Sequence, residues 1–388
     1  MSWSQLPHQT LASVTVASVS MILFFWMGRA LGPEAFGGWN VVFTWAALGM
    51  LVVDGGFRVL IFREEAGGVL QGRIVDLAFG HWLVMALIAL PVSGFFFPGY
   101  LVMGAVVFVL ASVAVGYRSA WLKAMGSFKE DALWQVKCRF LSAAVVAGVL
   151  IANAGVEYIL WAWALGLLLC LLQIWPWLVT IRPVPDFNPG VYRPVAALLL
   201  IDAATVLYLR ADILMLEWLG AGHQRIGLYV VAARVLEGVA LLSAPVAHIF
   251  FRQVRLQWLA GIWQRESVLP LMAGSMCLGI ILTGAAVMAG DTPWQWLLGP
   301  GYEGVGSILP WLLGATVFML PNALLTQVAL AIHGEWKYAM AAMAAALANI
   351  LLNLWWIPVW DIYGAAMATV AAEALLMCVL IPCLGRRG

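Results

Sequence analysis

Long apolar segments are the feature that most constrains what this chain can fold into. Of its 388 residues, 64% are hydrophobic and only 10% are charged. Soluble domains are about 45–50% apolar and about 25% charged. A helix that crosses the ~30 Å hydrocarbon core of a bilayer needs about 20 mostly apolar residues. The composition therefore disfavours a soluble enzyme, a secreted disulfide scaffold, a disordered chain and a nucleic-acid binder, and it favours an all-α polytopic membrane protein.

The breaks between apolar runs predict about twelve transmembrane helices. The proline-rich segment 182–190 cannot continue a helix, and it divides these spans six and six. We therefore expect an N-terminal six-helix lobe over residues 1–185 and a C-terminal six-helix lobe over residues 186–388, arranged around a central cavity. The expected spans are 10–31, 38–60, 77–97, 99–121, 139–155, 157–181, 194–219, 226–250, 268–289, 306–332, 338–357 and 362–383.

Short matches between the two halves suggest an internal duplication. Gly126-Ser-Phe-Lys129 corresponds to Gly334-Glu-Trp-Lys337, and Cys170 corresponds to Cys378 at the same offset. An even number of helices in each repeat gives parallel halves, related by an axis along the membrane normal. Two such lobes suit alternating access.

The distribution of basic residues predicts the orientation. Most of the 20 Lys and Arg residues fall in alternate connections, including the segment 118–139 between spans 4 and 5. The opposite side holds only Arg29 and Arg225. Because positive residues stay on the cytoplasmic side, both termini are expected inside. The N-terminus lacks the features of a cleaved signal peptide, so the first span is expected to be retained.

Neither a metal site nor a cofactor site is expected. The five cysteines form no CxxC pair, and the five histidines are scattered without ligand spacing. No nucleotide-binding loop of the Walker type occurs. The chain is therefore expected not to be an enzyme.

Charges inside spans 7 and 8 are the strongest candidates for function. Span 7 carries Asp202, Arg210 and Asp212, and span 8 carries Arg234 and Glu237. An ionisable side chain near the bilayer centre costs ~2.5–3.5 kcal/mol and usually faces a bundle interior or an aqueous cavity. Two interpretations stay open. Asp212 and Arg234 form a neutralising pair that locks the hairpin, or at least one arginine remains available to bind an anion.

Polar residues in other spans are weaker candidates. Arg58 lies one helical turn after Asp54, where the two form an interfacial pair. Arg118, at the end of span 4, has the position of a snorkelling topogenic charge. Glu373 is the only charged residue expected in span 12, where it would be either a buried neutral acid or a proton site.

Two further spans carry uncharged polar residues. Asn322 follows Pro321, where a kink frees backbone groups to line a cavity. Gln327 lies on the same span. Asn349 and Asn353 are one turn apart, as expected of polar contacts between helices.

Several segments resemble one transporter family along the whole chain. Together they are similar to Wzx-type polysaccharide (oligosaccharide) flippases of the multidrug/oligosaccharidyl-lipid/polysaccharide exporter (MOP) superfamily. The matching segments are Arg29-Ala-Leu-Gly-Pro-Glu-Ala-Phe-Gly37, Asp54-Gly-Gly-Phe-Arg58, Arg63-Glu64, Arg210-Ala-Asp212, Leu219-Gly220, Gly227-Leu-Tyr229, Leu298-Gly-Pro-Gly-Tyr302, Asn349 to Asn353, and Tyr363-Gly-Ala-Ala366.

The resemblance implies a MATE/flippase-like fold and a function in surface polysaccharide biosynthesis, such as O-antigen, capsule or exopolysaccharide. Undecaprenyl-diphosphate-linked oligosaccharide would cross the bacterial inner membrane by alternating access. Polysaccharide polymerase and glycosyltransferases are then the expected partners. The residues expected to bind the substrate are Arg210, Arg234, Asn322, Gln327, Arg58 and Arg118, and those expected to couple an ion are Asp212, Glu237 and Glu373.

Three alternatives remain. A drug/cation antiporter of the same superfamily needs unpaired acids in its cavity, whereas here arginines and acids are mixed. Lipid II flippases usually carry about two further helices. A membrane glycan polymerase or ligase needs a large outer loop with catalytic residues, and the longest outer loop expected here, 290–304, has no Lys or Arg.

Overall fold

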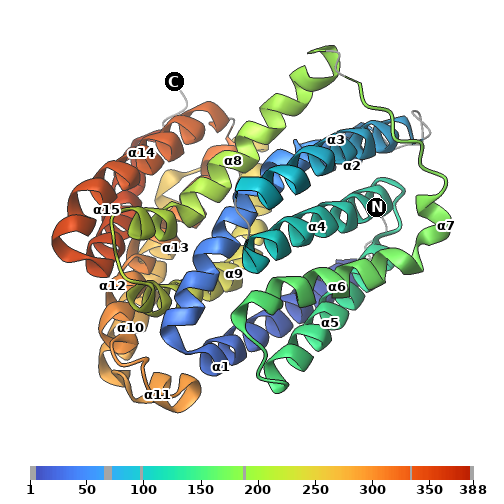
Figure 1. Ribbon diagram of the computed structural model, residues 1–388. Coiled ribbons are helices and arrows are strands. Elements are labelled where there is room, and N and C mark those ends of the chain that lie inside the picture. Colours follow the sequence, from blue (N-terminus) through green and yellow to red (C-terminus); the bar gives the residue numbers. More distant parts are fainter. Residues whose placement is uncertain (1–5, 65–71, 97–98, 187–188, 333, 385–388) are drawn as a thin grey trace. The chain divides into compact units, whose positions relative to one another are not determined.

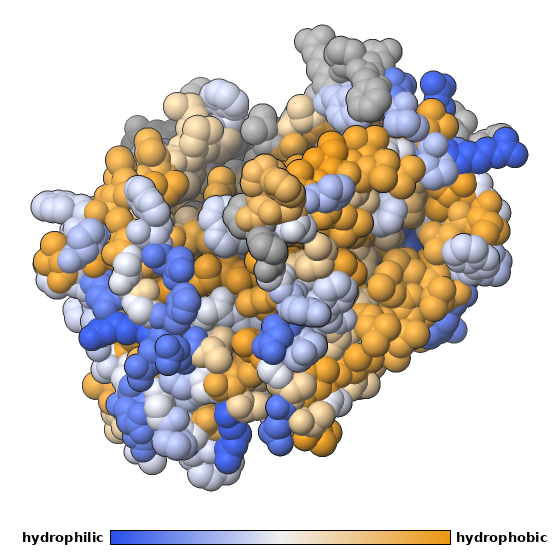
Figure 2. All heavy atoms as spheres, in the orientation of Figure 1, coloured by the Kyte–Doolittle hydropathy of each residue, from blue (hydrophilic) through white to orange (hydrophobic). Residues whose placement is uncertain are grey.

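The computed structural model describes residues 6–64, 72–96, 99–186, 189–332 and 334–384, and within these ranges every regular element is a helix (Figure 1). Nine helices in the described ranges are long and apolar enough to cross a membrane. Large hydrophobic side chains such as Phe95 (80% exposed) and Met288 (90% exposed) lie on the surface, and hydrophobic side chains cover broad areas of the face in Figure 2. The expected class, an all-α multi-pass membrane protein, is confirmed.

The chain divides into two compact units. Unit 1 comprises Met1–Leu31 and Trp39–Arg210, so the division falls inside α8 (Pro189–Trp218). In unit 1, α4, α5 and α6 pack against one another (Figure 1). Apart from α8, its elements are α1 (Leu6–Asp54), α2 (Phe57–Glu64), α3 (Arg73–Phe96), α4 (Tyr100–Ala124), α5 (Phe128–Ile151), η2 (Val156–Tyr158), α6 (Ile159–Gln173) and α7 (Trp175–Leu178).

Unit 2 comprises Gly32–Gly38 and Ala211–Gly388. Its most extensive helix pair is α14 with α15, which run side by side (Figure 1). Its elements are the end of α8, α9 (His223–Leu259), η3 (Arg265–Ser267), α10 (Leu269–Ala289), α11 (Thr292–Leu298), α12 (Val305–Gly314), α13 (Thr316–Ala331), α14 (Glu335–Trp360), α15 (Ile362–Leu380) and η4 (Ile381–Leu384).

The first two predicted spans are two helices that meet at a kink, and both carry the label α1. The bend is at Gly32, whose φ of 74° and ψ of 165° interrupt the helix just before Pro33. The short stretch that follows the bend packs tightly in unit 2. A Cβ atom on Gly37 would overlap the backbone oxygen of His223, and one on Gly227 would overlap that of Pro33. Glycine is needed at both positions because the backbones approach so closely.

The predicted connection between spans 4 and 5 is mostly helical, which corrects the expected span 139–155. Helix α5 begins at Phe128, after a short turn that follows α4. The charged residues of 129–139 indicated a loop, yet the carboxylate of Asp131 is fully buried. It lies in a set of polar contacts that the sequence pattern did not reveal.

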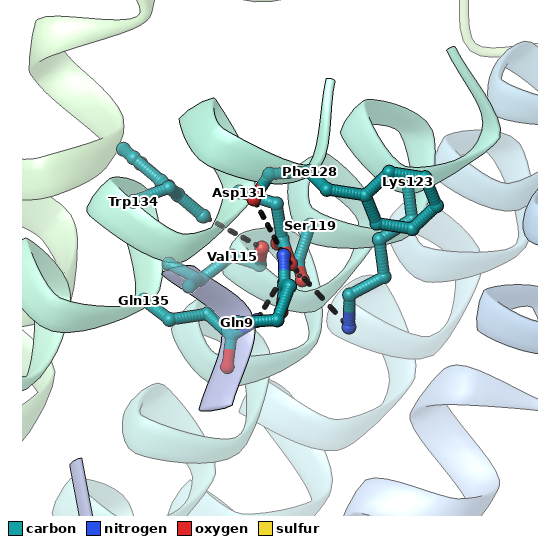
Figure 3. Close-up of polar contacts among 8 residues, drawn as sticks. All are labelled: Gln9, Val115, Ser119, Lys123, Phe128, Asp131, Trp134 and Gln135. Carbon is teal, nitrogen blue, oxygen red and sulfur yellow. Dashed lines mark hydrogen bonds and ion pairs between the residues drawn. The ribbon is translucent and has the colours of Figure 1, made fainter. Parts of the chain in front are cut away.

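Asp131 joins three helices of unit 1 (Figure 3). Its Oδ1 accepts a hydrogen bond from Ser119 Oγ at 2.5 Å. Its Oδ2 accepts from Gln135 Nε2 at 2.7 Å and from Gln9 Nε2 at 3.1 Å, and Lys123 Nζ lies 3.6 Å away. A buried carboxylate with this many donors is satisfied, so α5 can start within the protein.

The proline-rich segment after α7 packs onto α3. Asp76 accepts a hydrogen bond from the backbone N–H of Arg182 at 2.8 Å through Oδ1, and one from that of Val184 at 3.2 Å through its backbone oxygen. The absence of a side chain at Gly80 makes room for Val184. Residues 182–184 of the proline-rich segment are therefore attached to unit 1.

Candidate functional site

Asp212 lies in unit 2 at the centre of a cluster of neutral donors. Its Oδ2 accepts hydrogen bonds from Tyr229 Oη at 2.7 Å and from Thr369 Oγ1 at 3.2 Å. Its Oδ1 accepts from Asn353 Nδ2 at 2.8 Å. The same amide also donates to Asn349 Oδ1 at 3.0 Å. Helices α8, α9, α14 and α15 thus each contribute to one polar cluster, which we call the Asp212 cluster.

No basic side chain contacts Asp212 in the part of the chain that the structure describes. Tyr229, Asn349 and Asn353 are almost fully buried, at 2%, 5% and 0% exposed. Asn353 Oδ1 is buried and receives no hydrogen bond. A carboxylate with amide and hydroxyl oxygens around it provides the hard oxygen ligands that small hard cations prefer. The cluster can therefore hold a proton or a small metal ion.

Arg234 pairs with Glu237 rather than with Asp212. Arg234 Nη1 lies 2.6 Å from Glu237 Oε2, one turn along α9, and both side chains are partly buried. The alternative in which Asp212 and Arg234 neutralise each other is therefore wrong. Two expected roles, anion binding by Arg234 and ion coupling by Glu237, thus fall on the two partners of one ion pair.

Asn322 and Glu373 are likewise brought together. Asn322 Nδ2 donates to Glu373 Oε2 at 2.7 Å and to the Glu373 backbone oxygen at 2.8 Å. These residues are 3% and 5% exposed, so they form a buried contact between α13 and α15. Asn322 Oδ1 is also buried and receives no hydrogen bond. Gln327 lies one and a half turns further along α13 and is partly exposed.

Arg58 and Asp54 form the expected ion pair, although no continuous helix joins them. Gly55 and Gly56, with φ of 57° and 86°, separate α1 from α2. Arg58 Nε still lies 3.1 Å from Asp54 Oδ1. Tyr117 Oη donates to the Asp54 backbone oxygen at 3.2 Å. The Asp54 side chain is 2% exposed and that of Arg58 is 42% exposed, so the guanidinium keeps accessible surface.

Arg118 lies between two indole rings. Its guanidinium carbon is 4.6 Å from the ring centroid of Trp121 and 4.7 Å from that of Trp177. Within the described residues, its buried Nε and Nη1 atoms have no hydrogen-bond acceptor. Cation–π attraction to two rings therefore stabilises this arginine. Glu130 also attracts it, but no described carboxylate lies within ion-pair distance of it.

Arg210 and Asp202 differ in their surroundings within α8. Arg210 is partly buried and interacts with a neighbour, so it is not a free cation. Asp202 is also partly buried, and no hydrogen bond or ion pair joins its carboxylate to another described residue.

Arg139, Tyr229 and Thr369 were not among the expected site residues. Arg139 was assigned to a cytoplasmic connection, yet it lies in the middle of α5 over the ring of Trp163. Tyr229 and Thr369 lie 17 and 157 residues from Asp212 along the chain. Asp131 and Gln135 are four residues apart, as side chains in contact on one helix would be. This spacing was the available signal that α5 begins before the expected residue 139.

Neither a protein-family model nor a curated protein matches the sequence. Solved structures match by fold. The lipid II flippase MurJ, in an inward closed conformation, gives a TM-score of 0.70 at 13% identity and covers 96% of this chain and 86% of that chain. An inward-facing multidrug resistance MATE family transporter of the MOP superfamily gives 0.68 at 13% identity, covering 95% of this chain and 92% of that chain.

A third structure is a MOP superfamily transporter from Pyrococcus furiosus, described as having a binding pocket of reverse polarity. It gives a TM-score of 0.58 at 13% identity and covers 98% of this chain and 92% of that chain. At such low identity the likeness establishes the fold alone. The chain therefore has the fold of the MOP superfamily transporters.

Proposed function

We propose that this chain is an ion-coupled flippase for undecaprenyl-diphosphate-linked oligosaccharides in the bacterial inner membrane. The head group moves from the cytoplasmic to the outer leaflet by alternating access, for surface polysaccharide biosynthesis. The lipid tail stays in the bilayer, and no covalent bond is made or broken. The MOP fold and the sequence resemblance to Wzx-type flippases support this proposal. The proposal also places both termini in the cytoplasm and takes a polymerase and glycosyltransferases as partners.

The Asp212 cluster is the observation that carries the proposal. A carboxylate within a membrane-spanning helix is costly, and here no arginine or lysine offsets the cost. Its contacts are a phenol, a hydroxyl and an amide, which can reorganise around a bound cation. Occupation by a proton or sodium would therefore stabilise unit 2, and exchange of that cation between the two sides would drive the cycle.

Arginines in unit 1 support an anionic substrate. Guanidinium groups bind phosphates through several charge-assisted hydrogen bonds. Arg58 keeps accessible surface beside its carboxylate partner, and no described carboxylate lies within ion-pair distance of Arg118. In unit 2, Arg234 must exchange Glu237 for the diphosphate before it can bind, and Asn322 must release Glu373 before it can contact sugar.

Deletion of the gene in its native bacterium tests the proposal. The lipid-linked precursor should accumulate in the inner leaflet while surface glycan falls, and the wild-type gene should reverse both changes. Asp212→Asn should fail to restore export at normal expression. Asp202→Asn serves as the matched control on the same helix, and it should restore export. Full surface glycan in the deletion strain would contradict the proposal.

A drug/cation antiporter is the second candidate, and Asp202 is the observation that favours it. This carboxylate lies in a predicted span and has no partner in the described part of the chain. An antiporter for organic cations should lower the susceptibility of a host to cationic dyes, and Asp202→Asn should remove that resistance. Unchanged susceptibility on overexpression would exclude this function.

A further inference from the structure

Arg139 lies in the middle of α5, which is long and apolar enough to cross a membrane. Helix α5 extends 11 residues before Arg139 and 12 residues after it. At 1.5 Å per residue, both ends of the helix are about 17–18 Å away. The hydrocarbon core is ~30 Å thick, so the backbone of Arg139 is near its centre. An ionisable residue at that depth indicates a functional site.

The side chain belongs to the buried side of α5. Residues Leu133, Phe140 and Ile151 are 62%, 51% and 71% exposed and mark the outer face of the helix. At about 100° per residue, each lies ~100–120° around the helix from Arg139. The fully buried Val146 lies only ~20° away from it. Arg139 therefore points toward the interior of unit 1.

Trp163 of α6 supports the guanidinium group. The guanidinium carbon of Arg139 is 5.5 Å from the ring centroid of Trp163. Trp163 in turn lies 6.3 Å from Trp39, with an interplanar angle of 8°, and 5.8 Å from Phe43, with an angle of 22°. The ring centroid of Phe108 in α4 lies 5.6 Å from that of Trp163. Helices α1, α4 and α6 thus form an aromatic wall beside one arginine.

This contact leaves the hydrogen-bonding capacity of Arg139 unused. A guanidinium carries five N–H donors in its plane, whereas the ring engages only its face. No hydrogen bond or ion pair joins these donors to any residue that the structure describes. Arg139 is only partly exposed, so bulk water can hydrogen-bond to only part of its guanidinium group. The N–H donors of Arg139 are therefore available to bind an anion.

We propose that Arg139 and Trp163 form a subsite inside unit 1 that binds a phosphate group of the lipid-linked substrate. The guanidinium donates to the phosphate oxygens, and the aromatic wall of Trp39, Phe43 and Trp163 provides an apolar surface for the neighbouring sugar ring. The inference rests on the proposed function, since it names where the same substrate is held. It also favours an anionic substrate over an organic cation.

Binding to the purified full chain in phosphatidylcholine nanodiscs tests this subsite. The probe is undecaprenyl diphosphate, with phosphatidylglycerol and inorganic diphosphate as competitors. Arg139→Gln should raise the Kd for undecaprenyl diphosphate by about tenfold or more, because the bidentate donor is lost. Arg139→Lys should raise it by roughly threefold to tenfold, because a point charge remains. Lys137→Gln is the matched control, since Lys137 is exposed on the same helix, and it should change the Kd by less than about twofold.

The outcomes separate this inference from the proposed function. Equal Kd values for wild type and Arg139→Gln, with Arg139→Lys also unchanged, would overturn the subsite. Equal Arg139-dependent binding of phosphatidylglycerol would overturn it too, because the residue would then hold ordinary phospholipid. The proposed function fails on a different result, when the wild-type gene does not restore glycan export in the deletion strain. Thermal unfolding of each variant shows whether a Kd change reflects misfolding.

Discussion

Units 1 and 2 each hold a buried charge outside an ion pair, and they surround it with different groups. In unit 1, Arg118 and Arg139 lie on indole rings, with no described carboxylate within ion-pair distance. In unit 2, Asp212 lies among neutral donors, and Arg234 of α9 pairs with Glu237. A cation on aromatic rings keeps its N–H donors available, and an anion among neutral donors keeps its charge available. The contrast suggests an anion site in unit 1 and a cation site in unit 2.

Buried carboxylates sharpen the same contrast. Asp131 in unit 1 has three hydrogen-bond donors and a lysine nearby, whereas Asp212 in unit 2 has three neutral donors alone. A carboxylate with a lysine has its charge balanced and serves to hold helices together. One without a basic partner stays responsive to added cations. The two residues should therefore respond differently to substitution.

Asp131→Ala should give the largest loss of stability. The change leaves the donors of Ser119 and Gln135 without their acceptor, at a cost of about 3 kcal/mol. Thermal unfolding of the purified protein in detergent measures this effect. Glu130→Ala, at the exposed neighbouring position, is the matched control and should change stability by less than ~0.5 kcal/mol. Equal effects at both positions would show that the contacts of Asp131 do not hold unit 1 together.

Asp212→Asn should change cation-dependent stability instead. A ligand that binds only the folded state at 100 times its Kd stabilises that state by about 2.7 kcal/mol. Sodium, or protons as the pH is lowered, should therefore raise the unfolding temperature of the wild type but not that of Asp212→Asn. Asp202→Asn is the control and should keep the cation response. A response that survives in Asp212→Asn would place the cation elsewhere.

Tyr229→Phe should weaken the same response without removing it. The phenol donates one of three hydrogen bonds to Asp212, and such a bond is worth about 1 kcal/mol. The cation concentration needed for half-maximal stabilisation should therefore shift roughly fivefold. Tyr363→Phe, which loses a hydroxyl contact to Ser307, should cause no shift. An equal shift in both variants would argue against a specific role for Tyr229.

Trp177→Leu should give the smallest effect. It removes one of the two rings that face Arg118, and a cation–π contact of this kind contributes about 0.5–1 kcal/mol. Thermal unfolding measures the loss, with Trp175→Leu as the control, because Trp175 is 58% exposed in the same short helix. No difference between the two variants would mean that Arg118 does not depend on its aromatic neighbours.

Local sequence patterns predicted the helices better than they predicted the contacts between helices. Apolar runs were enough to predict the all-α class and most spans, because each run fixes its own helix. The start of α5 was missed because the charged residues around Asp131 indicated a loop. Asp131 itself is buried by contacts with Ser119, Lys123 and Gln9, which belong to other helices. That error also placed Arg139 at the cytoplasmic end of a span rather than in the middle of α5.

The candidate site shows the same limit. Asp212 was expected to matter because a charge in a span is costly. Its partners Asn353 and Thr369 come from α14 and α15, far along the chain, and sequence spacing carries no information about such contacts. Spacing did predict the pair of Asp54 and Arg58, since the two residues are only four apart along the chain.

Transport in proteoliposomes tests the central claim most directly. The vesicles contain the purified protein and a fluorescent undecaprenyl-diphosphate-linked oligosaccharide, and an impermeant quencher reports the fraction in each leaflet. We predict translocation that depends on an imposed proton or sodium gradient, is lost in Asp212→Asn and is strongly reduced in Arg139→Gln. Gradient-independent translocation that is equal in all three proteins would contradict the account.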